Sequence, residues 1–226
     1  MKKFTTRNKF DLTLKNGYVG NIKSCIAIFS CLFFFTTQNN VALASNSLNT
    51  DHQADLQKIE KYLNNIQNLS ADFTQKSERG QVKGRFYLSR PGKMRVEYKG
   101  QPKILIVVNG SVLTYKDLEL DEISSLGTNT TPASFLTRDH ISFDAKDVKL
   151  VDFTKNDEFT SVAVIKKNRP EAGEFRLIFK NEPFGFVKME VKDEFNQITS
   201  IGLENITFPQ NLDSDLFVIR NKNLPL

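Results

Sequence analysis

The segment GRFYLSRPGKMRVEY, residues 84–98, decides the fold. Successive side chains of an extended chain point to opposite faces of a sheet, so one apolar face runs along its first half and ends at Arg90. Pro91-Gly92 is typical of a tight turn, because proline fixes φ and glycine accepts a positive φ. The second half resumes the alternation. The segment therefore predicts a β-hairpin whose shared face consists of Gly84, Phe86, Leu88, Arg90, Met94, Val96 and Tyr98.

Arg90, at the end of this apolar face, permits two interpretations. A snorkelling side chain would lay its aliphatic stem on apolar surface and keep its guanidinium in water. Alternatively, its five N–H donors, arranged in a planar fork, would hold the end of a helix or loop by its carbonyl oxygens. The strand alternation alone leaves both interpretations open.

Residues 1–44 are typical of a cleaved secretory signal peptide. They hold six Lys or Arg residues against one Asp, which accounts for the whole net charge of +5, so the remainder has no basic excess that would attract nucleic acid. An apolar run over residues 25–35 precedes the cleavage pattern Ala42-Leu43-Ala44. An uncleaved membrane anchor needs about 20 apolar residues, and the polar residues 38–40 interrupt this run. We therefore expect residues 45–226 to form the exported domain, which contains no cysteine.

Two helices are expected in that domain. The first, capped by Thr50 or Asp51, is amphipathic. A second, short helix should follow Thr131-Pro132, a typical cap and first-turn pair. The apolar face of the first helix consists of Leu56, Ile59, Leu63 and Ile66.

The rest of the domain is predicted to form about eleven strands joined by short turns, which favours antiparallel pairing. The apolar run 104–108 should be a central strand covered on both faces. Strands are also expected over 118–124 and, briefly, near 216–219. The exported part contains 13 phenylalanines, and a sheet this large has more apolar face than two modest helices can cover. It must therefore fold into a sandwich, or curl and enclose a cavity.

No motif in the sequence proposes a reaction. His52 and His140 have no potential metal ligands at suitable spacing, so neither a metal site nor a cofactor is expected. Hydrolase, zinc-protease, phosphate-loop and dinucleotide-binding signatures are missing from the sequence. Asp117, Glu119 and Asp121 would share one face of the predicted strand 118–124, where a solvated acidic face is the simplest interpretation. The sequence thus favours a binding protein over an enzyme.

Several segments in order resemble the outer-membrane lipoprotein carrier family of the Gram-negative periplasm, LolA. Together they extend from about residue 50 to residue 220, and each is weak alone. The segments are Ala71–Gln75, Gly84–Tyr98, Val107–Tyr115, Thr131–Leu136, Met189–Asp193 and Leu216-Phe217. The family's proline-glycine segment after the last phenylalanine is replaced here by residues 218–222, and Met94 replaces a more usual aromatic residue.

This resemblance implies a mainly β fold, in which a single curved antiparallel sheet forms an unclosed half-barrel with a helical lid. It implies that Arg90 is a latch between lid and barrel, and that Leu56, Ile59, Leu63 and Ile66 belong to the lid helix. The acyl-chain cavity would then be lined by Phe73, Phe86, Leu88, Met94, Val96, Tyr98, Ile104, Ile106, Leu113, Tyr115, Phe135, Leu136 and Met189.

The function implied by the resemblance is that of a periplasmic chaperone that binds lipoprotein acyl chains and ferries them between the two membranes. Its expected partners are acylated lipoproteins, an inner-membrane lipoprotein-releasing ABC transporter and, if present, an outer-membrane acceptor, with the carrier itself a monomer that binds no nucleic acid. A general carrier of lipids or glycolipids is one alternative. An envelope-stress module that senses lipoproteins is another, and it would be expected to carry a second domain.

Overall fold

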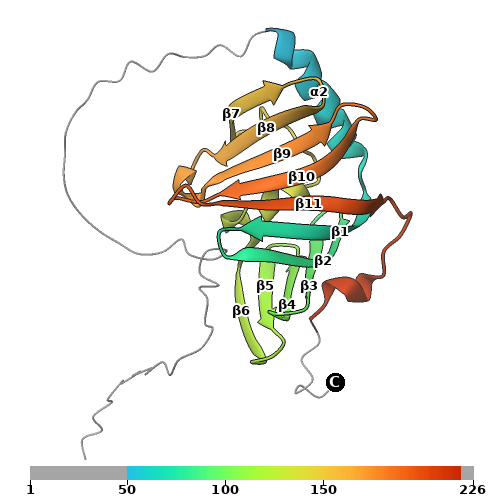
Figure 1. Ribbon diagram of the computed structural model, residues 1–226, viewed down its shortest axis with the longest axis vertical. Coiled ribbons are helices and arrows are strands. Elements are labelled where there is room, and N and C mark those ends of the chain that lie inside the picture. Colours follow the sequence, from blue (N-terminus) through green and yellow to red (C-terminus); the bar gives the residue numbers. More distant parts are fainter. Residues whose placement is uncertain (1–49, 220–226) are drawn as a thin grey trace, which may run out of the picture. The chain divides into compact units, whose positions relative to one another are not determined.

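The computed structural model describes residues 50–219, so the predicted signal peptide and its cleavage site lie outside the described residues. Eleven strands form one antiparallel sheet in the order β6-β5-β4-β3-β2-β1-β11-β10-β9-β8-β7 (Figure 1). This confirms the predicted single, unclosed sheet. The strands are β1 (Asn68–Ser77), β2 (Gly80–Ser89), β3 (Lys93–Lys99), β4 (Ile104–Asn109), β5 (Val112–Asp117), β6 (Glu122–Gly127), β7 (Val148–Lys155), β8 (Phe159–Lys166), β9 (Glu174–Lys180), β10 (Gly185–Lys192) and β11 (Ile198–Thr207).

The sheet consists of two meanders that meet in its centre. Strands β1 to β6 pair in sequence, as do β7 to β11, and the pairing of β1 with β11 joins the two sets. The free edges are therefore β6 and β7, which are consecutive in the chain. The connection between them, residues 128–147, runs from one free edge of the sheet to the other.

Short helices accompany the sheet, as the sequence predicts. The apolar stripe of α2 is buried, since Ile59 and Leu63 are 0% and 2% exposed. Both α2 and α3 pack against the apolar face of the sheet, where their buried residues join those of the strands in one core. The helices are α2 (Thr50–Asn65) and α3 (Ala133–Thr137), with 3-10 turns η1 (Thr128–Thr130), η2 (Pro170–Ala172) and η3 (Ser214–Phe217). Within residues 50–219, no helix has the length and apolar character needed to cross a membrane.

Strand β4 is covered on both faces, as its continuous apolar sequence predicts. Val108 belongs to the main core on one face of the sheet. Leu105 and Val107 lie on the opposite face, where they pack against Phe217 of η3 in a second, smaller core. The C-terminal segment therefore supplies the cover for the outer face of β4 (Figure 1).

Two strand predictions, for residues 118–124 and for residues near 216–219, are wrong in position. Residues 118–121 form a turn, and β6 begins only at Glu122, because the Asp117 carboxylate accepts the backbone N–H groups of Glu119 and Leu120 and so stabilises the turn. Asp117, Glu119 and Asp121 consequently do not share one strand face. Residues 214–217 form η3 instead of a strand near 216–219, since Asp213 caps a helical turn by accepting from the N–H of Asp215.

Gly84 is the position where the hairpin tolerates no side chain. It pairs with Phe73 on β1 and with Tyr98 on β3, and these two rings meet edge to face at 5.3 Å. A Cβ at residue 84 would lie 2.1 Å from the carbonyl oxygen of Glu97 and 2.4 Å from the Phe73 ring. Glycine therefore lets an aromatic side chain cover the backbone of the neighbouring strand.

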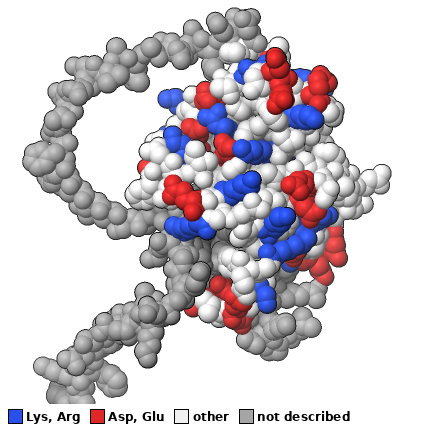
Figure 2. Space-filling model, viewed as in Figure 1, with Lys and Arg blue, Asp and Glu red and all other residues white. Residues whose placement is uncertain are grey.

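The outer face of the sheet carries interleaved charges. Figure 2 shows Lys and Arg side chains mixed with Asp and Glu over the visible face. Arg176, for example, pairs with Asp152 at 2.7 Å and Glu174 at 2.8 Å. The alternation of apolar and charged residues thus separates a dry face from a wet one, which is typical of an antiparallel sheet covered on one side.

Candidate functional site

The apolar face of the sheet and the buried faces of both helices form one continuous core, and the residues predicted to line a cavity gather there. Two members of the predicted set, Ile104 and Tyr115, are buried, and Tyr115 pairs with Ile106 on the neighbouring strand. The eleven other members of the predicted set all lie in this core or pack against it: Phe73, Phe86, Leu88, Met94, Val96, Tyr98, Ile106, Leu113, Phe135, Leu136 and Met189.

In this state the core is filled by its own side chains. Phe179 is fully buried, with its ring centroid 5.5 Å from that of Phe186 and 6.0 Å from that of Tyr62 on α2. Phe135 of α3 lies 6.1 Å from Phe175 of β9. Both helices therefore contact the sheet through aromatic rings. These side chains occupy the space between the helices and the sheet, so an apolar ligand would bind here only after they separate.

Arg90 lies at the rim of this core and is only 8% exposed. Its position follows from the hairpin, because it continues the apolar face of β2 by one residue beyond the strand end. The guanidinium points away from bulk water and toward the ends of both helices. Its hydrogen bonds run from Nε to Arg138 O (2.9 Å), from Nη1 to Leu63 O (2.5 Å) and Ile66 O (3.4 Å), and from Nη2 to Asn64 Oδ1 (3.1 Å) and Asp139 O (2.9 Å).

All five acceptors of the Arg90 side chain are neutral oxygens. The carbonyls at the C-terminal end of a helix have no partner within the helix and carry partial negative charge, so a cation is favourable at the end of α2. Burial lowers the pKa of the Arg90 guanidinium below its ordinary value, an effect that Asp139 opposes and Arg138 reinforces. Arginine nevertheless stays protonated, because its ordinary pKa is so high. Arg90 thus joins the two helix ends by charge-assisted hydrogen bonds.

The backbone of the same turn holds both helix ends as well. Arg90 N–H donates to Gln67 O at 2.8 Å, just after α2, and Gly92 N–H donates to Thr137 O at 2.7 Å, at the end of α3. The turn between β2 and β3 is therefore a single point where the sheet contacts both helices through polar groups.

Asn64 is a residue of this site that sequence reasoning missed. Its side-chain amide forms two hydrogen bonds with Ile141, donating to the carbonyl at 2.8 Å and accepting from the N–H at 2.9 Å. One turn earlier, Glu60 accepts from Phe143 N–H at 2.6 Å. These bonds join α2 to the segment after α3, so the two helices form one connected cover. A lone polar residue near a helix end gives no sequence signal of such a role.

These features define a lidded half-barrel: an open sheet with a dry concave face, two helices over that face and one arginine that connects helices and sheet. The family model for the outer membrane lipoprotein carrier protein LolA matches residues 64–220. The outer-membrane lipoprotein carrier protein of Methylococcus capsulatus is 30% identical over 176 residues, covering 71% of this chain and 80% of the relative. That of Chromobacterium violaceum is 28% identical over 153 residues, covering 64% of this chain and 72% of the relative.

The chain belongs to the LolA family of outer membrane lipoprotein carrier proteins. As the sequence predicts, it is therefore a member of a carrier family and not an enzyme. A solved structure of a LolA superfamily protein from Nitrosomonas europaea is 9% identical, with a TM-score of 0.42. The match covers 73% of this chain and 97% of that protein's chain. The assignment rests on the family model and the Methylococcus relative.

Proposed function

We propose that this protein is a periplasmic carrier that takes acyl chains of lipoproteins into the space beneath its helices and carries them from the inner to the outer membrane. The observation that supports this most directly is the Arg90 contact at the rim of the core. Besides this turn, α2 is bonded to the sheet by the ion pair of Asp55 with Lys155 and by Tyr62, whose hydroxyl accepts from Phe186 N–H. None of these bonds belongs to the strand ladder, so the cover can separate without disrupting the sheet. The apolar residues beneath the cover would then become available to a ligand.

The energetics of such a carrier require a competing closed state. Hiding one C16 chain from water contributes roughly 12 kcal/mol, at about 0.8 kcal/mol per methylene group. A carrier that gained all of this would not release its cargo. Repacking the side chains of the filled core, and re-forming the Arg90 hydrogen bonds, would offset part of that gain. We therefore propose that the closed state weakens the net affinity to a level at which cargo can leave.

The partners in this proposal are acylated lipoproteins as cargo, an inner-membrane lipoprotein-releasing ABC transporter as donor and an outer-membrane acceptor. The carrier would act as a monomer and encounter these partners in turn. The thirteen predicted lining residues are proposed to contact the acyl chains in the open state, and Leu56, Ile59, Leu63 and Ile66 to move with the lid.

The test is to incubate the exported domain with spheroplasts and identify what appears in the soluble fraction bound to it. The proposed function predicts acylated lipoproteins in stoichiometric complex with the protein. A matched sample with Leu63 replaced by Glu, which places a charge in the buried face of the lid helix, should release less.

Other outcomes separate the alternatives. Recovery of free phospholipid or glycolipid without lipoprotein would contradict the proposal and favour a general lipid carrier. Recovery of neither, with the domain folded by circular dichroism, would favour a sensing module that binds lipoproteins without extracting them.

A further inference from the structure

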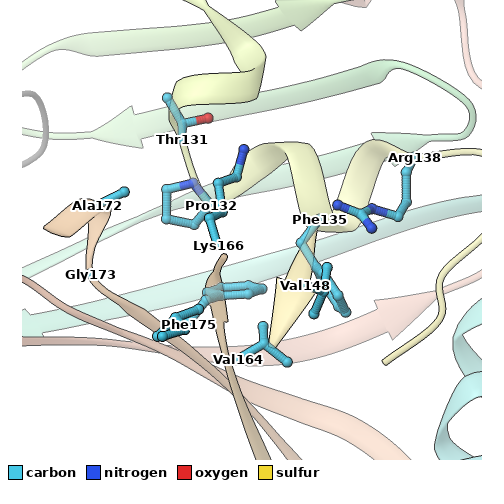
Figure 3. A pocket seen from close by; sticks show the side chains of 11 residues that line it. Thr131, Pro132, Phe135, Arg138, Val148, Val164, Lys166, Ala172, Gly173 and Phe175 are labelled. Atoms are coloured by element: carbon cyan, nitrogen blue, oxygen red, sulfur yellow. The ribbon is translucent and has the colours of Figure 1, made fainter. Parts of the chain in front are cut away.

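A small cleft reaches the core beside α3, between that helix and the ends of β8 and β9 (Figure 3). Its walls are almost entirely apolar, with Phe135 and Pro132 on the α3 side and Val164 and Phe175 on the sheet side. Phe135, Val164 and Phe175 also belong to the main core, so the cleft is continuous with the interior. Its volume is about 30 Å³, which admits water but not an acyl chain.

The rim of this cleft is cationic. Arg138 and Lys166 both line it, and the Arg138 guanidinium lies 5.0 Å from the centre of the Phe135 ring. Lys166 is the last residue of β8, and its ammonium donates to the carbonyl oxygen of Asn129 in η1. Each cation thus stands at the boundary between the apolar walls and water, where the charged group of an amphiphile would lie.

The charges around Lys166 do not balance. Burial lowers the pKa of Lys166, and among its neighbours Asp147 opposes that effect while Arg138 and Arg169 add to it. The one carboxylate in this group is already shared, because Arg138 donates to Asp147 at 3.0 Å. Two cations that line the mouth of the apolar cleft, Arg138 and Lys166, therefore share the single carboxylate of Asp147.

We propose that this rim, Arg138 and Lys166, binds the anionic headgroup of a single-molecule lipid ligand whose acyl chain passes through the cleft into the core. This goes beyond the proposed function, because the acyl anchor of a lipoprotein carries no phosphate, and it rests on that function only in using the same interior for the chain. An acyl chain alone would leave the excess positive charge uncompensated. A phosphate ester would accept hydrogen bonds from both the guanidinium and the ammonium.

The Lys166 contact suggests how the headgroup and the cleft are linked. Asn129 follows the edge strand β6, whereas Lys166 ends β8 beside the other edge strand, β7. Their hydrogen bond therefore connects the two sides of the gap in the sheet. A phosphate that attracts Lys166 would compete with the Asn129 carbonyl and weaken this connection. The cleft, too small for a chain in the closed state, would then widen where the chain has to pass.

The experiment compares two ligands with the same chain, dodecyl phosphate and uncharged dodecyl maltoside, each below its critical micelle concentration. Affinity is measured by calorimetry for the exported domain and for two variants, Lys166→Gln and Lys167→Gln. Lys167 is an exposed neighbour that does not line the cleft, so it is the matched control. The wild-type protein should bind the phosphate about tenfold more tightly, the scale of one charge-assisted hydrogen bond. Lys166→Gln should lose most of this preference and Lys167→Gln should keep it.

Each other result overturns a defined part of the argument. Equal affinity of the wild-type protein for the two ligands, or an undiminished preference in Lys166→Gln, would refute the headgroup site while leaving acyl-chain binding intact. No binding of either ligand would instead contradict the proposed function itself. Retention by vesicles of anionic phospholipid without preference for monomeric dodecyl phosphate would show that the rim faces a bilayer, which also refutes the single-molecule site.

Discussion

The guanidinium of Arg90 donates to Asn64 Oδ1 at 3.1 Å, and the same oxygen accepts the N–H of Ile141 at 2.9 Å. One amide oxygen therefore receives hydrogen bonds from the sheet rim and from the segment after α3. Asn64 itself belongs to α2. Three separate parts of the chain thus meet at one atom, the side-chain oxygen of Asn64.

Replacing Arg90 with leucine should leave the sheet folded and favour opening of the helices. The variant removes five hydrogen bonds at the rim, of which the two to Leu63 O and Ile66 O are buried. Amide hydrogen exchange in α2 should become faster by an amount equivalent to about 2–3 kcal/mol, while β1, β2 and β11 exchange as before. Arg85→Leu on the outer face of the same hairpin is the control. Unchanged α2 exchange and unchanged lipoprotein transfer in Arg90→Leu would rule out the latch.

The Arg90 and Asn64 substitutions should be non-additive. Asn64→Leu removes the two bonds to Ile141 and the acceptor for Arg90, and is expected to cost about 1–3 kcal/mol of lid stability. Combined with Arg90→Leu, the total should fall short of the sum by more than about 0.5 kcal/mol, because the two residues share a bond. A double-mutant cycle on exchange-derived free energies measures this. Asn65→Leu, at an exposed neighbouring position, is the control substitution. Strict additivity of the Arg90 and Asn64 substitutions would mean that the two side chains act independently.

Gly84→Ala should destabilise the whole domain by at least about 2 kcal/mol, because a Cβ there meets a backbone oxygen that cannot move without disturbing the β2–β3 ladder. Gly202→Ala in β11 is the matched control, since the nearest atom to its added Cβ is 3.9 Å away. Urea denaturation of both variants checks this. Equal midpoints for the two alanine variants would disprove the close approach of Phe73 to Gly84.

Asp72 should make stability depend on acid pH. Its hydrogen bonds from Asn205 and Arg85 lower the pKa of this carboxyl from 3.8 to about 2. Because the folded pKa lies below the unfolded one, the stabilisation is fully present above pH 3.8 and is lost as the pH falls toward 2. The stability difference between wild-type protein and Asp72→Asn, followed by urea denaturation, should therefore shrink over that range. Asn205→Ala should weaken the same dependence, and a difference that is constant from pH 5 to pH 2 would contradict the assignment.

Phe217→Ala should release the C-terminal segment from the sheet. Phe217 is 2% exposed against Leu105 and Val107, so its removal is expected to cost up to about 3 kcal/mol locally. Hydrogen exchange of residues 212–219 should become fast while the main core stays protected. Phe208→Ala, at a position that is 55% exposed, should change little. Equal protection of residues 212–219 in both variants would mean that Phe217 does not hold this segment.

The parts of the fold that sequence reasoning predicted are those that local physics determines. The alternation of apolar and polar side chains in residues 84–98 predicted the hairpin, its buried face and the position of Arg90 at the end of that face. The continuous apolar run of β4 predicted cover on both sides, although only the structure identifies Phe217 as the residue that supplies it. These patterns lie within single strands or hairpins, so they can be read without knowledge of distant contacts.

Other features depend on contacts that no local pattern records. The Asp117 carboxylate converts an apparent strand into a turn by accepting two backbone N–H groups. Asn64 acquires its partners from a segment 77 residues away in the chain. The cationic rim of the cleft likewise brings together Arg138, just after α3, and Lys166, at the end of β8. Sequence alone predicts most of the elements, whereas the pairing of polar side chains across elements requires the fold.

The position of the free edges has a mechanical consequence. Because β1 pairs with β11 in the middle of the sheet, the gap lies between β6 and β7, whose backbone groups share no ladder. Moving these two edge strands apart would break no hydrogen bond between strands. The molecule could thus expand to accommodate a guest and contract again while its backbone framework stays intact.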